Sequence, residues 1–282
     1  MDHSGNKKNV GGFDIRKLVG LGLLTAIVIV LQFIGASIRF GTFSVSLVLM
    51  PIVVGAALYG VGAGAWLGLV FGIVVLLSGD ANLFLGINAV GTVVTVIAKG
   101  VLAGALSGLV YTWLANLFSK SLSTERLAVF ITCFLLIIGG DVCLYYGIKL
   151  NNAPAVRVDV GDMESTAMPG TFCLVFGIVL MVIGLALLAF VLIKKPDLDT
   201  SAAVFVSAAV CPIVNTGVFL LGCWLFFFDT VKSWAGDTNV GTYMIVGLVG
   251  LNFIFELAVN LILSPAIVML IRYGQKSIAK KH

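Results

Sequence analysis

Charge is scarce in this chain: only 11% of its 282 residues are Asp, Glu, Lys or Arg, and 60% are hydrophobic. A soluble domain of ordinary composition has about 25% charged and about 45–50% apolar residues. The chain therefore lacks the polar side chains that would cover a water-soluble surface of its size. This composition excludes a soluble enzyme and a soluble nucleic-acid-binding domain, and it indicates a membrane protein.

Histidine is nearly absent, because the two histidines, His3 and His282, lie at the two ends of the sequence. The five cysteines form no C-x-x-C motif, and we interpret them as small hydrophobic side chains packed in helices. A phosphate-binding loop of the form G-x-x-x-x-G-K-S/T is also missing, which excludes ATP hydrolysis by that route. We therefore expect no metal, no cofactor and no catalytic site, which leaves a carrier, a channel or a binding subunit.

Long apolar runs fill most of the sequence, and a transmembrane helix needs about 20 mainly apolar residues. The runs predict an all-α, polytopic membrane helix bundle with eight spans, at residues 18–38, 45–59, 61–78, 89–117, 127–147, 170–193, 202–228 and 242–271. The first run is longer than the core of a signal peptide, so we interpret it as a retained span. The second run is short and contains Pro51, and residues 82–91 are predicted to form a surface loop.

The basic residues give an independent test of this count, because cytoplasmic loops are enriched in Lys and Arg. With eight spans and a cytoplasmic N-terminus, four of the 17 basic residues (Arg39, Lys149, Arg157 and Lys232) lie outside, Lys99 lies within a span, and the other twelve lie inside. One missing or extra span would place basic segments on the wrong side. The distribution predicts that both termini are cytoplasmic.

Glycines recur at intervals of four inside the apolar runs, at Gly60, Gly64, Gly68 and Gly72 and again at Gly100, Gly104 and Gly108. Residues four apart share one helix face, and small residues there allow two helix backbones to approach closely. The stripes therefore predict close packing between helices. The first span carries a shorter version in Gly22 and Ala26, for which internal packing and docking of a partner protein stay equally open.

Two ionisable residues, Lys99 and Glu256, fall near the middle of predicted spans, where a Lys or an Asp costs about 2.5–3.5 kcal/mol to insert. Such residues indicate a functional site unless they form a buried pair. Polar residues at helical spacing accompany them, and Pro212 precedes two more at similar depth in the seventh span. The predicted substrate-binding residues are Lys99, Asn215, Thr216, Asn252, Glu256, Thr95 and Asn88.

Two interpretations of this polar set stay open. In the first, Lys99 neutralises an anionic or carboxylate-bearing nutrient, Asn215 and Thr216 hydrogen-bond it, and Asn252 and Glu256 hold its polar remainder or position Lys99. In the second, Lys99 and Glu256 pair with each other and nothing binds.

Several segments, taken in their order and spacing, resemble the substrate-binding S components of energy-coupling factor (ECF) vitamin transporters. They are residues 40–51, 60–72, 99–104 and 212–217, and Asn252 with Glu256, Asn260, Ser264 and Pro265. The resemblance covers about residues 15–120 and 200–275. It implies a six-helix core in a prokaryotic plasma membrane that captures a vitamin or related micronutrient from outside.

The resemblance also implies partners. An S component docks on a transmembrane coupling protein that carries two ATPase subunits on separate chains, which is consistent with the missing phosphate loop. Family members use an Ala-x-x-x-Ala pattern in the first helix for docking, and Gly22 and Ala26 stand at the matching positions.

The expected organisation is a basic N-terminus at 1–17, a first core part at 18–120, an inserted two-span hairpin at 121–200, a second core part at 201–273 and a basic tail at 274–282. The insertion departs from the family pattern. Its outer loop carries Asp159, Asp162 and Glu164, and both a peripheral helix pair and a lid over the site stay open. The alternative functions are a stand-alone secondary transporter with Glu256 as its coupling residue, and a membrane scaffold that transports nothing.

Overall fold

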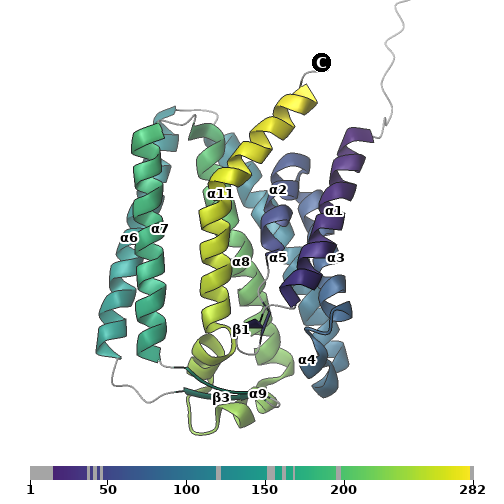
Figure 1. The fold of residues 1–282 in the computed structure, drawn as a ribbon, viewed down its shortest axis with the longest axis vertical. Helices are drawn as coiled ribbons and strands as arrows, with labels where there is room; N and C mark the ends of the chain where they lie inside the picture. The colour runs from purple at the N-terminus through teal and green to yellow at the C-terminus, as the bar shows by residue number, and fades with distance from the viewer. Residues whose placement is uncertain are drawn as a thin grey trace, which may run out of the picture.

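The computed structural model of the chain describes residues 15–36, 39–40, 43–44, 47–118, 122–150, 156–160, 163–167, 169–194 and 198–279. These residues form a helical bundle, in which two short antiparallel hairpins join helices (Figure 1). The elements in chain order are α1 (Ile15–Ala36), β1 (Arg39–Phe40), β2 (Phe43–Ser44), α2 (Leu49–Tyr59), α3 (Val61–Leu77), α4 (Asn82–Ile87), α5 (Ala89–Phe118), α6 (Leu122–Lys149), β3 (Val156–Val160), β4 (Met163–Ala167), α7 (Pro169–Lys194), α8 (Leu198–Phe226), α9 (Phe228–Ala235), α10 (Val240–Thr242), the π-helix η1 (Tyr243–Leu248) and α11 (Gly250–Ala279). The predicted helical class is confirmed.

Each of the eight predicted ranges overlaps one main helix, namely α1, α2, α3, α5, α6, α7, α8 and α11, and the last range also includes the π-helix η1. Within the described residues, four helical segments are long and apolar enough to cross a membrane: Lys17–Ala36, Ala89–Leu117, Ala203–Phe226 and Asn252–Gly274. By length and composition, these four helices suggest a membrane protein. Most of the predicted basic N-terminus, residues 1–14, and the last three residues of the tail lie outside the described residues.

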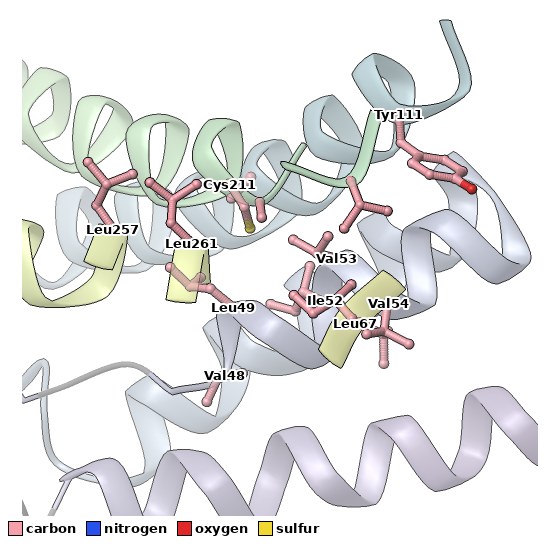
Figure 2. Packing of buried hydrophobic residues seen from close by; sticks show 14 of the residues in the cluster. Val48, Leu49, Ile52, Val53, Val54, Leu67, Tyr111, Cys211, Leu257 and Leu261 are labelled. Atoms are coloured by element: carbon pink, nitrogen blue, oxygen red, sulfur yellow. The ribbon is translucent and has the colours of Figure 1, made fainter. Parts of the chain in front are cut away.

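The short helix α2 forms the centre of the bundle. It is apolar on every side, every residue from Pro51 to Ala56 is buried, and it packs against α1, α3, α5, α8 and α11. Figure 2 shows Leu49 and Ile52 of α2 beside Leu261 of α11 and Leu67 of α3. A helix that is hydrophobic all round is one that is surrounded by others. Pro51 is tolerated because it lies in the first turn, where its missing N–H has no helical acceptor.

The two glycine stripes face each other across α3 and α5. A Cβ on Gly68 would fall on the carbonyl group of Gly100, and a Cβ on Gly64 would fall on the carbonyl group of Gly104. The prediction that these stripes pack helices closely is confirmed for both pairs. Gly60 differs, because it lies in the turn between α2 and α3 with a φ of 94° and would meet nothing within 4 Å.

The short segments that connect the long helices and the two ends of the chain lie at opposite ends of the bundle. The short elements α4, β1, β3 and α9 gather at one end, and the start of α1 and the end of α11 lie at the other (Figure 1). We call the first the hairpin end and the second the terminal end. The predicted surface loop at residues 82–91 is instead the short helix α4, a break at Asn88 and the first turn of α5, and it is anchored by the buried Phe84. The sequence prediction was wrong there because six residues are too few for a helical period to show.

Helices α6 and α7, within the predicted insertion at residues 121–200, form a peripheral pair. Helices α6 and α7 pack mainly on each other, with Gly140 and Gly177 in close backbone contact, and they touch the core through α8 and α11 (Figure 1). Their connecting hairpin, β3–β4, lies against α9 and η1, and Asp159 faces Glu164 in its register. Asp162 lies outside the described residues.

Two irregular features shape the last two core helices. Helix α8 continues through Pro212, so the residues that follow it stay on helical faces. The π-helix η1 precedes α11, and π-helical turns often occur at functional sites. Together these elements bring Asn215 of α8 opposite the first turns of α11.

Candidate functional site

A polar cavity lies toward the hairpin end of the bundle. Its volume is about 760 Å³, including space open to solvent. Six segments of the chain line it: α1, the end of α3 with the following turn, α4, the first half of α5, α8 with Phe227, and the start of α11 with Val249. Its polar lining residues are Gln32, Asp80, Thr92, Thr95, Lys99, Asn215, Thr216, Asn252 and Glu256.

Six of the seven predicted binding residues line this cavity: Lys99, Asn215, Thr216, Asn252, Glu256 and Thr95. The seventh, Asn88, is not among the lining residues. It precedes α5, and its Oδ1 accepts a hydrogen bond from the backbone N–H of Gly91 at 2.9 Å. Asn is a favoured helix cap because its side chain satisfies an N–H of the first turn. Asn88 therefore caps α5 and does not face the cavity with Thr95 and Lys99.

Glu256 is the centre of a hydrogen-bond network on α11. Its side chain is 2% exposed and accepts from Asn252 Nδ2 at 3.1 Å and, more weakly, from Asn215 Nδ2 at 3.5 Å. Asn260, one turn further along, donates instead to the backbone carbonyl of Glu256 at 2.9 Å. The network joins α8 to α11, because Asn215 lies on one helix and its acceptor on the other.

Lys99 reaches the cavity from α5. Its Nζ lies over the rings of Phe71 and Phe219, at 5.5 Å and 5.6 Å from the two centroids, within the range of a cation–π contact. The carboxyl groups of Glu256 and Asp80 act on it electrostatically. Within the part of the chain that the structure describes, Lys99 forms no hydrogen bond and no direct ion pair. Its ammonium group can therefore donate hydrogen bonds to a ligand.

Sequence reasoning missed Gln32 and Asp80 as lining residues. Gln32 of α1 is 1% exposed, and its Nε2 donates to Asp80 Oδ2 at 2.7 Å. Asp80 follows Gly79, whose φ of 85° turns the chain between α3 and α4. The sequence could have indicated Gln32, because a long polar side chain within an apolar span needs a buried partner.

Aromatic side chains form the apolar wall of the cavity. The ring of Phe84 meets the rings of Phe219 and Phe227 edge to face, with centroids 5.6 Å and 5.0 Å apart. Trp234 of α9 packs edge to face on the same Phe84 ring, with centroids 6.0 Å apart. Such contacts hold rings in fixed orientations. The wall is thus an aromatic, apolar surface beside the polar groups.

Several buried oxygen atoms of the lining residues lack a hydrogen-bond partner among the described residues. They are Gln32 Oε1, Thr95 Oγ1, Asn215 Oδ1 and Asn252 Oδ1. A buried polar atom without a partner costs about 1–3 kcal/mol. The concentration of such atoms in one cavity is typical of a site that a ligand completes.

A glycine of α8 makes room for one of these oxygens. A Cβ on Gly222 would fall on the side chain of Thr95, so only glycine allows Thr95 to lie against α8. On the same helix, a Cβ on Gly217 would meet nothing within 4 Å. The position of Thr95 in the lining therefore depends on Gly222.

The predicted docking residues lie far from the cavity, on the exposed side of α1. Gly22 and Ala26 are both exposed, and a Cβ on Gly22 would meet nothing within 4 Å. The helix packs on α2 and α3 through its other side, where a Cβ on Gly20 would fall on the Tyr59 side chain. Internal packing, one of the two interpretations of Gly22, therefore does not occur among the described residues.

Metal-ligand chemistry is not evident in the described part of the chain, where no group of three or more His, Cys, Asp and Glu residues could hold a metal ion. The cysteines there are unpaired, and Cys133, Cys211 and Cys223 are buried, which fits the interpretation of small hydrophobic side chains.

Comparison of the chain with family models, with curated proteins and with solved structures finds no match. The geometry of the cavity therefore carries the functional argument.

Proposed function

We propose that this chain is the membrane-embedded substrate-binding subunit of an ECF-type importer and captures a vitamin or related small nutrient. The observation that carries the proposal is the cavity, in which buried polar groups from α1, α5, α8 and α11 converge beside an aromatic wall. Small-molecule sites combine apolar and aromatic walls with convergent polar groups, and this cavity has both. The sequence has no phosphate-binding loop, and in this proposal partner ATPases supply the energy for uptake.

The proposal includes eight membrane spans with both termini in the cytoplasm. The cavity then opens toward the outer side, because the hairpin end lies opposite the termini. Exposed aromatic side chains support this arrangement, since Trp and Tyr gather at the two membrane interfaces. Trp113 and Tyr273 lie near the terminal end, whereas Tyr145 and Trp224 lie near the hairpin end, and all four are more than half exposed.

The exposed side of α1 supports the presence of a protein partner. In an 18-residue window of the segment Lys17–Ala36, only 17% of the residues are buried within this chain. Gly22 and Ala26 form a smooth strip on that surface, against which another transmembrane helix can pack closely. We therefore propose this strip as the contact with the transmembrane coupling protein.

Copurification and uptake test the proposal together. The tagged chain is expressed with and without a coupling protein and its two ATPases, as the wild type and as Gly22→Leu and Ala26→Leu. We expect both variants to lose copurification of the coupling protein and uptake, while still retaining the copurifying small molecule identified by mass spectrometry. The matched control is Leu23→Trp, a bulky change at an exposed neighbouring position of α1. Copurification that both strip variants leave unchanged would exclude the docking surface.

A second candidate rests on Glu256, a buried acid within a membrane helix. Intramembrane acids carry coupling protons in many transporters, so a stand-alone secondary transporter is the alternative function. It predicts uptake that persists in cells without any ECF ATPase and that Glu256→Gln abolishes. Absence of both a copurifying small molecule and transport, together with a stable protein partner, would favour a scaffold instead.

A further inference from the structure

Three carboxamide side chains in the cavity share one arrangement. The amide nitrogens of Gln32, Asn215 and Asn252 each donate to a carboxylate oxygen, of Asp80 for Gln32 and of Glu256 for the other two. A carboxylate only accepts hydrogen bonds, so each acid fixes which end of the amide faces it. Each amide carbonyl oxygen is therefore turned away from the acid, and all three are buried without a partner among the described residues.

Lys99 brings hydrogen-bond donors to the cavity, whereas the three amide carbonyl oxygens are acceptors. An ammonium group has three donors and no acceptor, and Lys99 forms no hydrogen bond within the described part of the chain. A ligand that satisfies the cavity must therefore offer an acceptor to Lys99 and hydrogen-bond donors to the amide carbonyls. A simple carboxylate supplies only the first.

The shape of the apolar wall adds a third requirement. Phe84, Phe219 and Phe227 are held edge to face, and Phe219 also lies beside the Lys99 ammonium group. A planar ring can contact such a wall over a large area and lose little conformational entropy on binding. The acceptor for Lys99 would then lie in or on that ring, near Phe219.

We propose that the cavity takes a planar nitrogen heterocycle of the lactam type, a ring in which N–H groups alternate with C=O groups. Lys99 donates to a ring carbonyl, while the carbonyls of Gln32, Asn215 and Asn252 accept from ring or exocyclic N–H groups. This inference rests on the proposed binding role and narrows its substrate class. It also revises the expectation of an anionic or carboxylate-bearing nutrient, which considered Lys99 without Gln32 and without the orientation of the amides.

Matched pairs of small rings test the inference on the purified full-length chain in lipid nanodiscs. Saturation-transfer NMR compares uracil, xanthine and lumazine with their N-methylated counterparts, and with benzoate as an aromatic carboxylate. We expect the N–H forms to bind at millimolar or lower concentration and the methylated forms to bind at least about tenfold more weakly, because a site built to hydrogen-bond an N–H group rejects its absence strongly. Equal binding of the methylated rings, preference for benzoate, or no signal from any N–H ring would overturn the inference.

A pair of variants on α11 tests whether the N–H rings bind in the cavity. We expect Asn252→Leu to weaken the N–H rings by about tenfold, the equivalent of one hydrogen bond, and Asn260→Leu to leave their binding unchanged. Asn260 is a matched control because it is buried, belongs to the same helix and has an unpaired Oδ1, but does not line the cavity. Equal losses in the two variants, with equal changes in melting temperature, would show a structural effect and overturn the assignment.

The experiments can overturn the proposed ligand class and the proposed importer role independently of each other. The NMR measurement uses the chain alone, so a preference for benzoate would overturn the lactam inference and leave the importer role intact. Binding of the N–H rings without any effect of the coupling protein and ATPases on uptake would retain the ligand class and overturn the importer role.

Discussion

Gly68 and Gly100 each occupy the space that a side chain on the other would need. The carbonyl group of Gly100 lies where a Cβ on Gly68 would stand, and the carbonyl of Gly68 lies where a Cβ on Gly100 would stand. Two backbones in contact cannot give way as a flexible side chain can. This mutual contact fixes the distance between α3 and α5, and it also fixes Lys99, the residue before Gly100.

We therefore predict that Gly68→Ala destabilises the protein by about 1–3 kcal/mol, the usual cost of overpacking. The control is Gly62→Ala on the same helix, where a Cβ would meet nothing within 4 Å. There, alanine should be neutral or stabilise by up to about 1 kcal/mol, because it restricts the unfolded chain and favours the helix. Thermal unfolding in detergent measures both, and equal effects would contradict the stripe contact.

Thr95 depends on Gly222 in the same way, but here the expected loss is in ligand binding. Gly222→Ala pushes the Thr95 side chain out of its place in the cavity lining, and we expect the affinity for the copurifying ligand to fall about tenfold, as for one lost hydrogen bond. Gly217→Ala on the same helix adds a methyl group in open space and should leave the affinity unchanged. Isothermal titration calorimetry on the purified chain separates the two, and a wild-type affinity for Gly222→Ala would mean that Thr95 has no role in binding.

Helix positions were predictable because the membrane allows few alternatives. Every backbone polar group in lipid must bond within its own segment, so a long apolar run becomes a helix. The sequence could not show that α2, with only 11 residues, is the centre of the bundle, since this depends on which helices surround it. Nor could it show the π-helix η1, because a shift in backbone hydrogen bonding leaves no periodic signal in side-chain polarity.

The candidate site was predictable where a residue is costly by itself. Lys99 and Glu256 stand out in apolar runs, and the residues at helical spacing from them follow within one helix. Gln32 and Asp80 could not be paired in this way, because 48 residues separate them along the chain and only tertiary packing brings them together. Asn88 differs from the other predicted residues, because it lies one position before the start of α5 at Ala89 and caps that helix instead of lining the cavity.

Coupling within the Glu256 network is the third prediction. The Asn252 amide bonds to the Glu256 side chain, so Asn252→Ala and Glu256→Ala remove the same interaction, and their effects on unfolding free energy should deviate from additivity by about 0.5–3 kcal/mol. Asn260 bonds to the Glu256 backbone carbonyl, which the Glu256→Ala change leaves in place. The Asn260→Ala and Glu256→Ala effects should therefore be coupled more weakly than those of the first pair. Chemical denaturation of the three single and two double variants gives both coupling energies, and similar coupling in the two cycles would contradict the assigned hydrogen bonds.

The orientation of the chain in the membrane is the last prediction, and three exposed positions are sufficient to test it. Lys17 lies at the start of α1, Lys149 at the end of α6 and Asp237 after α9. Each is replaced singly by cysteine in a chain whose five native cysteines are changed to serine or alanine.

With eight spans and cytoplasmic termini, a membrane-impermeant maleimide should label Lys149→Cys and Asp237→Cys in intact cells. Lys17→Cys should react only after the membrane is opened. Lys149 is the informative position, because it reports whether the inserted pair α6–α7 crosses the bilayer. If Lys149→Cys needs permeabilisation while Asp237→Cys does not, the pair lies at the cytoplasmic side and the chain has six spans. In that case the β3–β4 hairpin could not lie over α9 at the outer surface, in conflict with the contact that the structure shows.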